Sequence, residues 1–263
     1  MYEATINNER IVYEDIGSGI PILFIHPPGM GRKVFYEQIP LSKHFRLIIP
    51  DLVGQGDSTY NGYSEITIKR FSEDLTTLLD LLNIKSAVIF GYSAGGTIAQ
   101  YLCTHFPSRV KALILSGGYP VVDNFILKNE HKLGIYTVKK NKKFLSRVLA
   151  YSHTKDKRYR ETLTEHMFKS HTKVWAKFYQ ESLLFNCKEA LKSMNKPTLL
   201  MYGNKSDAMN TYIKYYKKEL LNKELFIIKG ASHQLPTKQP NYINQIIIGY
   251  LMNLEERIEK NIP

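Results

Sequence analysis

The chain has 263 residues, which is enough for one large domain or for one domain with an inserted subdomain. Hydrophobic residues make up 43% and charged residues 23%, a composition that excludes an intrinsically disordered chain. The formal net charge is +12, but residues 128–192 hold 16 Lys and Arg against 6 Asp and Glu. We interpret this basic segment as a solvated helical face, because no nucleic-acid-binding motif accompanies the charge. The alternative is that its field attracts anionic substrates, membrane surfaces or nucleic acid.

The sequence lacks the marks of an exported or membrane-spanning protein. No run approaches the ~18–20 consecutive apolar residues that cross a bilayer, and residues 1–10 contain no apolar signal core. The two cysteines, Cys103 and Cys187, form neither a disulfide framework nor a zinc-ligand pattern. We therefore expect a cytoplasmic protein with no membrane span, no metal and no organic cofactor.

Short apolar runs recur along the chain, and helical patterns separate most of them. Several runs are continuously apolar, which is typical of strands in a parallel sheet with helices on both faces. We predict strands at 11–16, 22–26, 46–50, 86–90, 110–116, 197–202 and 224–229. We predict helices at 66–83, 94–105, 209–221 and 242–258.

This alternation stops between residues 121 and 196, where Lys- and aromatic-rich helical patterns contain no convincing strand. We therefore predict an α/β protein with a mostly parallel central sheet flanked by helices and a helical cap insertion. Residues 1–121 and 197–263 would form the core, and residues 122–196 the cap. The cap would lie over the carboxyl ends of the strands, where open α/β sheets bind ligands.

Residues 91–95 read GYSAG and match the G-x-S-x-G pattern. A predicted strand leads into this motif and a predicted helix leads out, which is the context of a nucleophile elbow. Such a turn strains the backbone of Ser93 and projects its hydroxyl above the sheet. It also directs the backbone N–H of Ala94 at the helix N-terminus toward a developing oxyanion.

Three further motifs occur in the right order. Residues 24–29 (FIHPPG) resemble a strand followed by an H-G-x-G loop, residues 50–58 (PDLVGQGDS) resemble a D-x-x-G-x-G-x-S turn, and residues 230–233 (GASH) resemble a late histidine loop. With the elbow, they make the chain similar to the α/β-hydrolase fold superfamily from residue 11 to residue 252. The resemblance implies a serine hydrolase with a Ser-His-Asp triad. In the second motif we interpret Asp51 as an anchor for loop backbone.

A serine hydroxyl needs a neighbouring base, which histidine supplies. We assign this role to His233, because the order Ser…Asp…His is that of the family. Asp207 is the predicted acid, although it stands one residue later than the usual G-x-x-D spacing places it, and Asp123 is the alternative. Surface positions are expected for the four histidines of the basic segment, His131, His153, His166 and His171.

The second oxyanion donor is normally an N–H of the loop after the third strand. Pro28 occupies that position and has no N–H. Either Gly29 or Met30 donates instead, or the oxyanion hole lacks one donor. We expect His26 to order this loop. The predicted substrate contacts come from His26, Met30, Tyr92 and Tyr119.

These residues predict a carboxylesterase-like enzyme that cleaves an ester, thioester or similar acyl substrate through an acyl-enzyme. If the basic segment faces the entrance, anionic small-molecule substrates should be preferred. A carbon–carbon bond hydrolase or a perhydrolase with the same triad is an alternative. A slow or non-catalytic small-molecule-binding protein is another, because fold alone does not fix function. Neither a nucleic-acid partner nor an oligomeric state is predicted.

Overall fold

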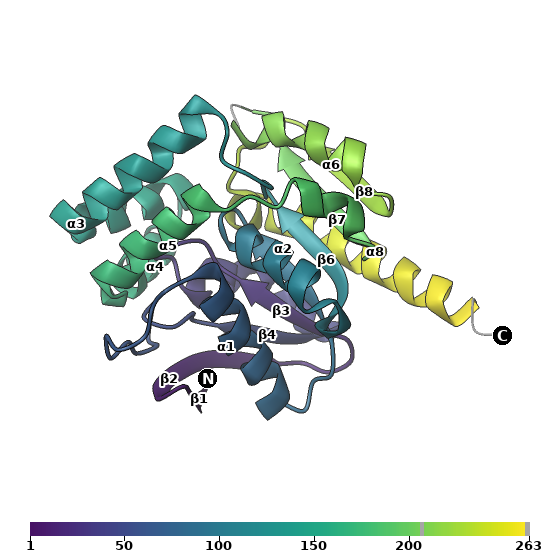
Figure 1. Cartoon of the computed structure of the whole chain (residues 1–263), viewed down its shortest axis with the longest axis horizontal. Helices are drawn as coiled ribbons and strands as arrows, with labels where there is room; N and C mark the ends of the chain where they lie inside the picture. Colours follow the sequence, from purple (N-terminus) through teal and green to yellow (C-terminus); the bar gives the residue numbers. More distant parts are fainter. Residues whose placement is uncertain (206–207, 261–263) are drawn as a thin grey trace.

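The computed structural model describes residues 1–205 and 208–260 (Figure 1). Within them, eight strands form one sheet in the order β1-β2-β4-β3-β5-β6-β7-β8. β1 pairs antiparallel with β2, and β2 with β4, whereas all other neighbours are parallel. The predicted α/β class with a mostly parallel sheet is confirmed.

The seven predicted strands are all present and correspond to β2–β8. The eight strands described are β1 (Tyr2–Ile6), β2 (Glu9–Ile16), β3 (Pro21–Ile25), β4 (Arg46–Pro50), β5 (Ala87–Tyr92), β6 (Val110–Ser116), β7 (Thr198–Gly203) and β8 (Lys223–Ile228). Strand β1 was not predicted. It forms a hairpin with β2 through Asn7 and Asn8, which both have positive φ angles, 51° and 62°. Asparagine tolerates this conformation, so the Asn-Asn pair was the available signal for a tight turn.

The helices occupy the connections between strands. They are η1 (Arg32–Lys43), α1 (Ile68–Leu81), α2 (Gly95–His105), η2 (Pro107–Arg109), α3 (Phe125–His153), α4 (Lys157–Lys169), α5 (Thr172–Leu184), η3 (Glu189–Ser193), η4 (Ala208–Tyr212), α6 (Ile213–Glu219), α7 (Leu235–Lys238) and α8 (Pro240–Lys260). Of the helices described, none is both long enough and apolar enough to traverse a bilayer.

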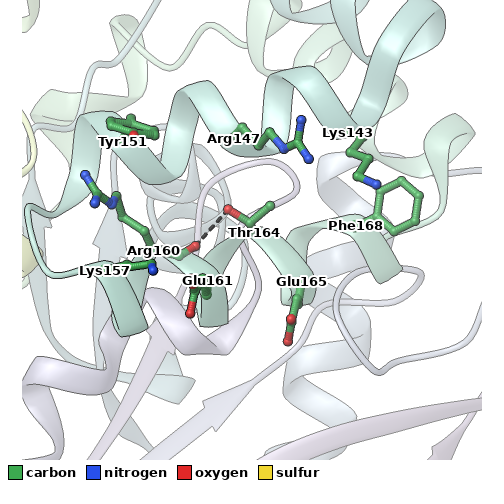
Figure 2. Close-up of a pocket in the computed structure, with 9 residues that line it drawn as sticks. All are labelled: Lys143, Arg147, Tyr151, Lys157, Arg160, Glu161, Thr164, Glu165 and Phe168. Carbon is green, nitrogen blue, oxygen red and sulfur yellow. Dashed lines mark hydrogen bonds between the residues drawn. The ribbon is translucent and has the colours of Figure 1, made fainter.

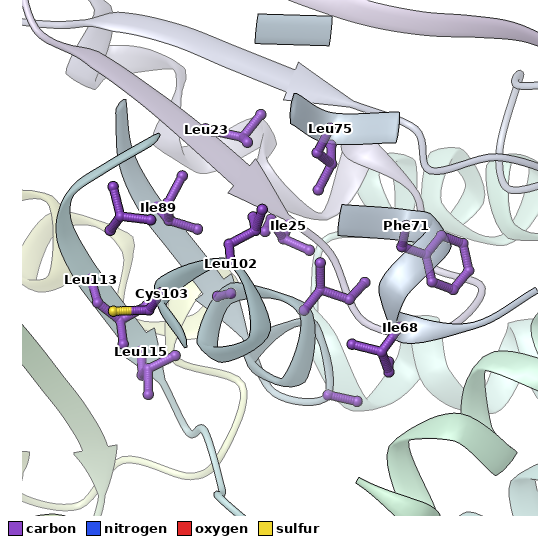
Figure 3. Packing of buried hydrophobic residues seen from close by; sticks show 14 of the residues in the cluster. Leu23, Ile25, Ile68, Phe71, Leu75, Ile89, Leu102, Cys103, Leu113 and Leu115 are labelled. Carbon is purple, nitrogen blue, oxygen red and sulfur yellow. The ribbon is translucent and has the colours of Figure 1, made fainter. Parts of the chain in front are cut away.

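Each face of the sheet has its own apolar core, because successive side chains of a strand point to opposite faces. From β3, Leu23 and Ile25 pack with α1 and α2 on one face (Figure 3). Ile22 and Phe24 join Phe35 of η1 and residues of α8 on the other face. Burial on both faces is the physical reason that the central strands are continuously apolar in sequence.

Between β6 and β7 the chain forms α3, α4 and α5, which we call the α3–α5 insertion (Figure 1). Asn141 has non-helical angles, φ −152° and ψ 78°, and divides α3 into a first arm, residues 125–140, and a second arm, residues 142–153. The first arm packs on α5, where Gly134 lies against the Tyr179 ring. The second arm packs on α4, where the Arg160 guanidinium lies over the Tyr151 ring at 4.2 Å from its centroid. The division into a core and a separate cap stays a prediction.

Candidate active site

Ser93 lies in the sharp turn between β5 and α2. Its φ of 52° is in the left-handed region, which is strained for a residue with a side chain. The two motif glycines allow this turn. A Cβ on Gly91 would lie 2.7 Å from the Gly96 Cα, and a Cβ on Gly95 would lie 2.2 Å from the Ile25 carbonyl oxygen. The two glycines therefore permit the close backbone approaches that hold Ser93 in a strained conformation at the carboxyl edge of the sheet.

His233 lies in the loop between β8 and α7, and its Nε2 is 2.8 Å from the Ser93 Oγ. The His233 ring stacks against Tyr92, with ring centroids 5.7 Å apart and an interplanar angle of 29°. On another side it lies against Gly117, where a Cβ would approach the ring Cε1 to 2.5 Å. Tyr92 and Gly117 thus confine the imidazole at hydrogen-bonding distance from the serine hydroxyl, as general-base catalysis requires.

The two candidate acids of the triad are Asp207 and Asp123. Asp207 lies outside the described residues, so its role remains a prediction. Asp123, the alternative, has an exposed side chain whose Oδ2 accepts a hydrogen bond from the Tyr215 hydroxyl at 2.6 Å. The Asp123 backbone N–H donates to the Tyr212 hydroxyl at 3.2 Å. These contacts tie Asp123 to η4 and α6.

The N–H groups that could serve as the second oxyanion donor, those of Gly29 and Met30, have other hydrogen-bond partners in the structure. The Gly29 N–H donates to the Gln55 side-chain oxygen, and the Met30 N–H donates to the Pro27 carbonyl at 3.2 Å. In this conformation neither the Gly29 nor the Met30 N–H is directed at the nucleophile, which agrees with the other alternative, an oxyanion hole that lacks one donor. Ala94, at the start of α2, lines the cavity beside Ser93. Its backbone N–H is the candidate donor that remains.

His26 orders the loop but does not contact substrate space, so its predicted substrate contact is wrong. It is fully buried, and its Nε2 accepts the Leu52 N–H at 3.1 Å. The ring proton therefore resides on Nδ1, which donates to the Pro27 carbonyl at 2.9 Å. Burial lowers the pKa of His26 to about 4, which keeps the ring neutral.

A cavity of about 360 Å³ lies over Ser93 and His233. It is lined by loops after β3 and β5, by both arms of α3, and by residues of α5, η4 and the His233 loop. Met30, Tyr92 and Pro28 are among its lining residues, whereas Tyr119 is not, so the predicted contact from Tyr119 is wrong. Glu130 is the one formally charged side chain besides histidine in the described lining, and no Lys or Arg contributes to it.

Both arms of α3 are fixed to the core by tyrosine–histidine pairs. The Tyr119 hydroxyl donates to His131 Nε2 at 2.8 Å, and the Tyr92 hydroxyl donates to His153 Nε2 at 3.0 Å. Each histidine donates its Nδ1–H to a carbonyl of α3. Burial lowers the pKa of both histidines to about 4. Tyr119 therefore acts through His131, which lines the cavity.

The surface positions predicted for the histidines of the basic segment are mostly wrong. His131, His153 and His166 are only 4, 5 and 4% exposed, whereas His171 is exposed. Helical periodicity gave no sign of this, because the partners that bury these rings lie far away in the sequence.

His166 belongs to a buried polar network centred on Asp51. The carboxylate accepts bonds from the Arg32 backbone N–H at 2.6 Å, from the Arg32 guanidinium, and from His166 Nε2 at 2.9 Å. Burial alone would raise the pKa of Asp51, but the His166 bond and the charges of His166 and Arg32 lower it to about 2. The network joins η1, the loop after β4 and α4, which agrees with an anchoring role.

Asp51, Asp57 and His166 are also the candidate metal-binding group among the described residues. The guanidinium of Arg32 contacts both carboxylates, at 2.8 Å for Asp57. It supplies the positive charge that a metal ion would bring, so these residues do not suit a metal.

The sequence matches the family described as alpha/beta hydrolase fold over residues 20–236, which is most of the chain. The chain belongs to the α/β hydrolase fold family. Within this family, 2-hydroxy-6-oxo-2,4-heptadienoate hydrolase of Pseudomonas putida is 32% identical over 114 residues, covering 41% of this chain and 40% of that protein. The aligned stretch is less than half the length of each of the first three curated relatives.

Solved structures share the α/β hydrolase fold at low identity. An esterase from Exiguobacterium antarcticum superposes with a TM-score of 0.84 at 19% identity, covering 94% of this chain and 97% of that chain. A bromoperoxidase from Bacillus anthracis superposes with a TM-score of 0.85 at 20% identity, covering 95% and 99%. Identities this low show the shared fold alone.

Three residues that no sequence motif indicated position the site in this α/β hydrolase. Gly117 provides room for the His233 ring, and the Ser116 backbone carbonyl accepts the Ser93 N–H at 2.8 Å. His153 positions Tyr92 by accepting a hydrogen bond from its hydroxyl. The Gly117-Gly118 pair directly after a predicted strand was an available signal for Gly117. Nothing in the local sequence marks His153, because its pairing depends on how α3 folds back.

Proposed function

We propose that this protein is a serine hydrolase that cleaves an ester, a thioester or a similar acyl compound through an acyl-enzyme. The observation that carries the proposal is the 2.8 Å contact between the Ser93 Oγ and the His233 Nε2, at a serine whose φ is 52°. A hydrogen-bonded base is what raises the nucleophilicity of a serine hydroxyl. The cavity above the pair provides room for a small substrate.

In the proposed reaction, the Ser93 Oγ attacks the carbonyl carbon while His233 Nε2 takes the hydroxyl proton. The negative charge on the carbonyl oxygen is stabilised by the Ala94 N–H and the N-terminus of α2. The imidazolium returns its proton to the leaving group, and an acyl-serine remains. His233 then deprotonates a water molecule that hydrolyses the acyl-serine, and Asp207 would orient the imidazole throughout.

The cavity lining favours a neutral, largely apolar acyl group. Its aliphatic side chains are Leu127, Leu133, Leu145, Leu149, Met30 and Met209. The basic residues of the α3–α5 insertion do not line the cavity, so the lining gives no support to a preference for anionic substrates. Neutral short-chain esters are therefore the substrates that we would test first.

Fluorophosphonate labelling and p-nitrophenyl acetate and butyrate hydrolysis test the proposal. Wild-type protein should be labelled and turn over both esters, and Ser93→Ala should do neither. The matched control is Ser193→Ala, which removes an exposed hydroxyl in η3 and should behave as wild type. If folded wild-type protein is not labelled, the serine-hydrolase proposal fails and a small-molecule-binding role becomes the better explanation.

A second candidate is hydrolysis of a carbon–carbon bond in a vinylogous diketone. The similarity to 2-hydroxy-6-oxo-2,4-heptadienoate hydrolase, which includes 114 aligned residues, favours it. Assaying such a dienoate beside the two esters separates the candidates. A kcat/KM for the dienoate well above that for the esters would favour carbon–carbon cleavage.

A further inference from the structure

The outer surfaces of both arms of α3 expose large apolar side chains. On the first arm, Phe125, Leu133 and Tyr136 are 79, 64 and 61% exposed. On the second arm, Phe144 and Tyr151 are 57 and 68% exposed. Their spacings of seven, eight and eleven residues place them on one face of each arm, opposite the buried face. Exposed apolar side chains grouped in this way mark interaction surfaces.

Positive charge surrounds these apolar side chains. Between Phe125 and His153 the chain has seven basic residues and one acidic residue, Glu130. The basic residues are Lys128, Lys132, Lys139, Lys140, Lys142, Lys143 and Arg147. Lys132 and Lys140 are each four residues from Tyr136 and therefore share its face of the first arm. Aromatic and aliphatic side chains rimmed by lysines are typical of helices that lie in the surface of an anionic membrane.

A groove of about 510 Å³ continues this surface between the second arm of α3 and α4 (Figure 2). Its basic lining residues come from both helices: Lys143 and Arg147 from α3, and Lys157 and Arg160 from α4. Glu161 and Glu165 of α4 also line the groove, so its basic residues outnumber its acidic ones by four to two, and both carboxylates point away from α3 (Figure 2). A guanidinium presents paired donors that match the oxygens of a phosphate.

We propose that this α3 surface, which comprises the exposed face of both arms and the groove toward α4, docks on an anionic phospholipid bilayer. The groove would take the phosphate headgroups, and the exposed aromatic and aliphatic side chains would enter the interfacial layer. A second copy of the chain fits less well, because pairing two such surfaces would bring together two helices that each carry a net charge of about +6.

The position of Leu133 connects docking with the site. Leu133 is exposed on the α3 surface and also lines the cavity above Ser93. A docked bilayer would therefore lie at the cavity mouth, and an amphiphilic acyl substrate would pass from lipid to cavity with little exposure to water. This consequence rests on the proposed function, whereas docking itself needs no catalysis.

Co-sedimentation with vesicles tests the charge requirement. Wild-type protein should bind vesicles that contain phosphatidylglycerol and should not bind pure phosphatidylcholine vesicles. Each basic residue near an anionic membrane contributes about fivefold to partitioning. The triple variant K132E/K140E/K143E should therefore bind at least about 100-fold more weakly, because the loss of three positive charges alone accounts for that factor and the three new carboxylates add repulsion. The matched control K43E/K85E/K111E makes the same charge change at exposed positions outside the insertion and should keep most of the binding.

Two apolar variants test insertion into the interface. Y136S/F144S should lose the binding that persists at high salt, whereas the control Y63S/L221S, at positions 93 and 83% exposed, should retain it. The proposal is overturned if wild-type protein ignores anionic vesicles, or if both triple variants lose binding equally. It is also overturned if the α3 substitutions instead abolish RNA binding or dissociate a dimer. Co-sedimentation measures binding without catalysis. A protein that hydrolyses no ester would therefore contradict the proposed function, while the docking proposal could still be tested.

Discussion

Replacing Gly117 with alanine should uncouple His233 from Ser93 while leaving the fold in place. The new Cβ would lie 2.5 Å from the ring Cε1 and 2.7 Å from Nδ1, where ordinary contacts begin at 3.4 Å. The imidazole must therefore move by about 1 Å. The φ of +63° at this position adds about 1–2 kcal/mol of backbone strain for any residue with a side chain.

A shift of this size disrupts the 2.8 Å contact between the Ser93 Oγ and the His233 Nε2. Misplacing a catalytic group by about 1 Å costs on the order of 10²-fold in rate. We expect Gly117→Ala to lower kcat for p-nitrophenyl butyrate by about 100-fold with little change in KM. Labelling by the fluorophosphonate should slow in parallel, because both reactions need an activated serine.

The matched control is Gly118→Ala. The atoms nearest to a Cβ there belong to the Leu115 side chain, at 3.1 Å or more, and the position does not have a left-handed φ. Urea denaturation would show that both variants are folded under assay conditions. If folded Gly117→Ala keeps a kcat within about threefold of Gly118→Ala, the reasoning about the confined imidazole is refuted.

Three further outcomes follow from the geometry. The buried α3 histidines, His131 and His153, have pKa values of about 4 when folded against 6.5 as the ordinary value, so the unfolded chain binds more protons between these limits. The free energy of unfolding should therefore be highest above about pH 6.5 and fall as the pH drops toward 4, by on the order of 3 kcal/mol for each histidine. In urea denaturation, H131Q/H153Q should show a weaker dependence of this free energy on pH. Asp51→Asn removes a carboxylate that holds the Arg32 guanidinium, so it should lower the free energy of unfolding by about 3 kcal/mol and leave kcat nearly unchanged. A large fall in kcat per folded molecule would instead place Asp51 in the reaction. Pro28→Ala supplies an N–H at the position of the missing oxyanion donor and should raise kcat at least tenfold, since one donor is worth about 10²–10³; a kcat that stays the same or falls would contradict this.

The central strands and the elbow were predictable from the sequence because their physical causes are local. Continuous apolar runs such as residues 22–25 report burial on both faces of a sheet, wherever the neighbouring strands lie. Of the two glycines in the GYSAG turn, Gly91 is required by the nearby backbone of Gly96, whereas Gly95 is required by the Ile25 carbonyl of a neighbouring strand. Ser93 and His233 were paired because their order along the chain matches that of the family that the sequence resembles.

What only the tertiary structure decided concerns groups brought together from distant segments. The bend at Asn141 turns α3 back, so that His131 reaches Tyr119 and His153 reaches Tyr92. Helical periodicity cannot reveal this, since an exposed and a buried polar face look alike until the partner is known. The same holds for the Gly29 N–H, whose direction depends on Gln55. The sequence indicated Ser93 and His233 as the candidate reacting pair, because the elbow and the late histidine loop are motifs of neighbouring residues. Packing between distant segments decided which way their N–H groups and rings point.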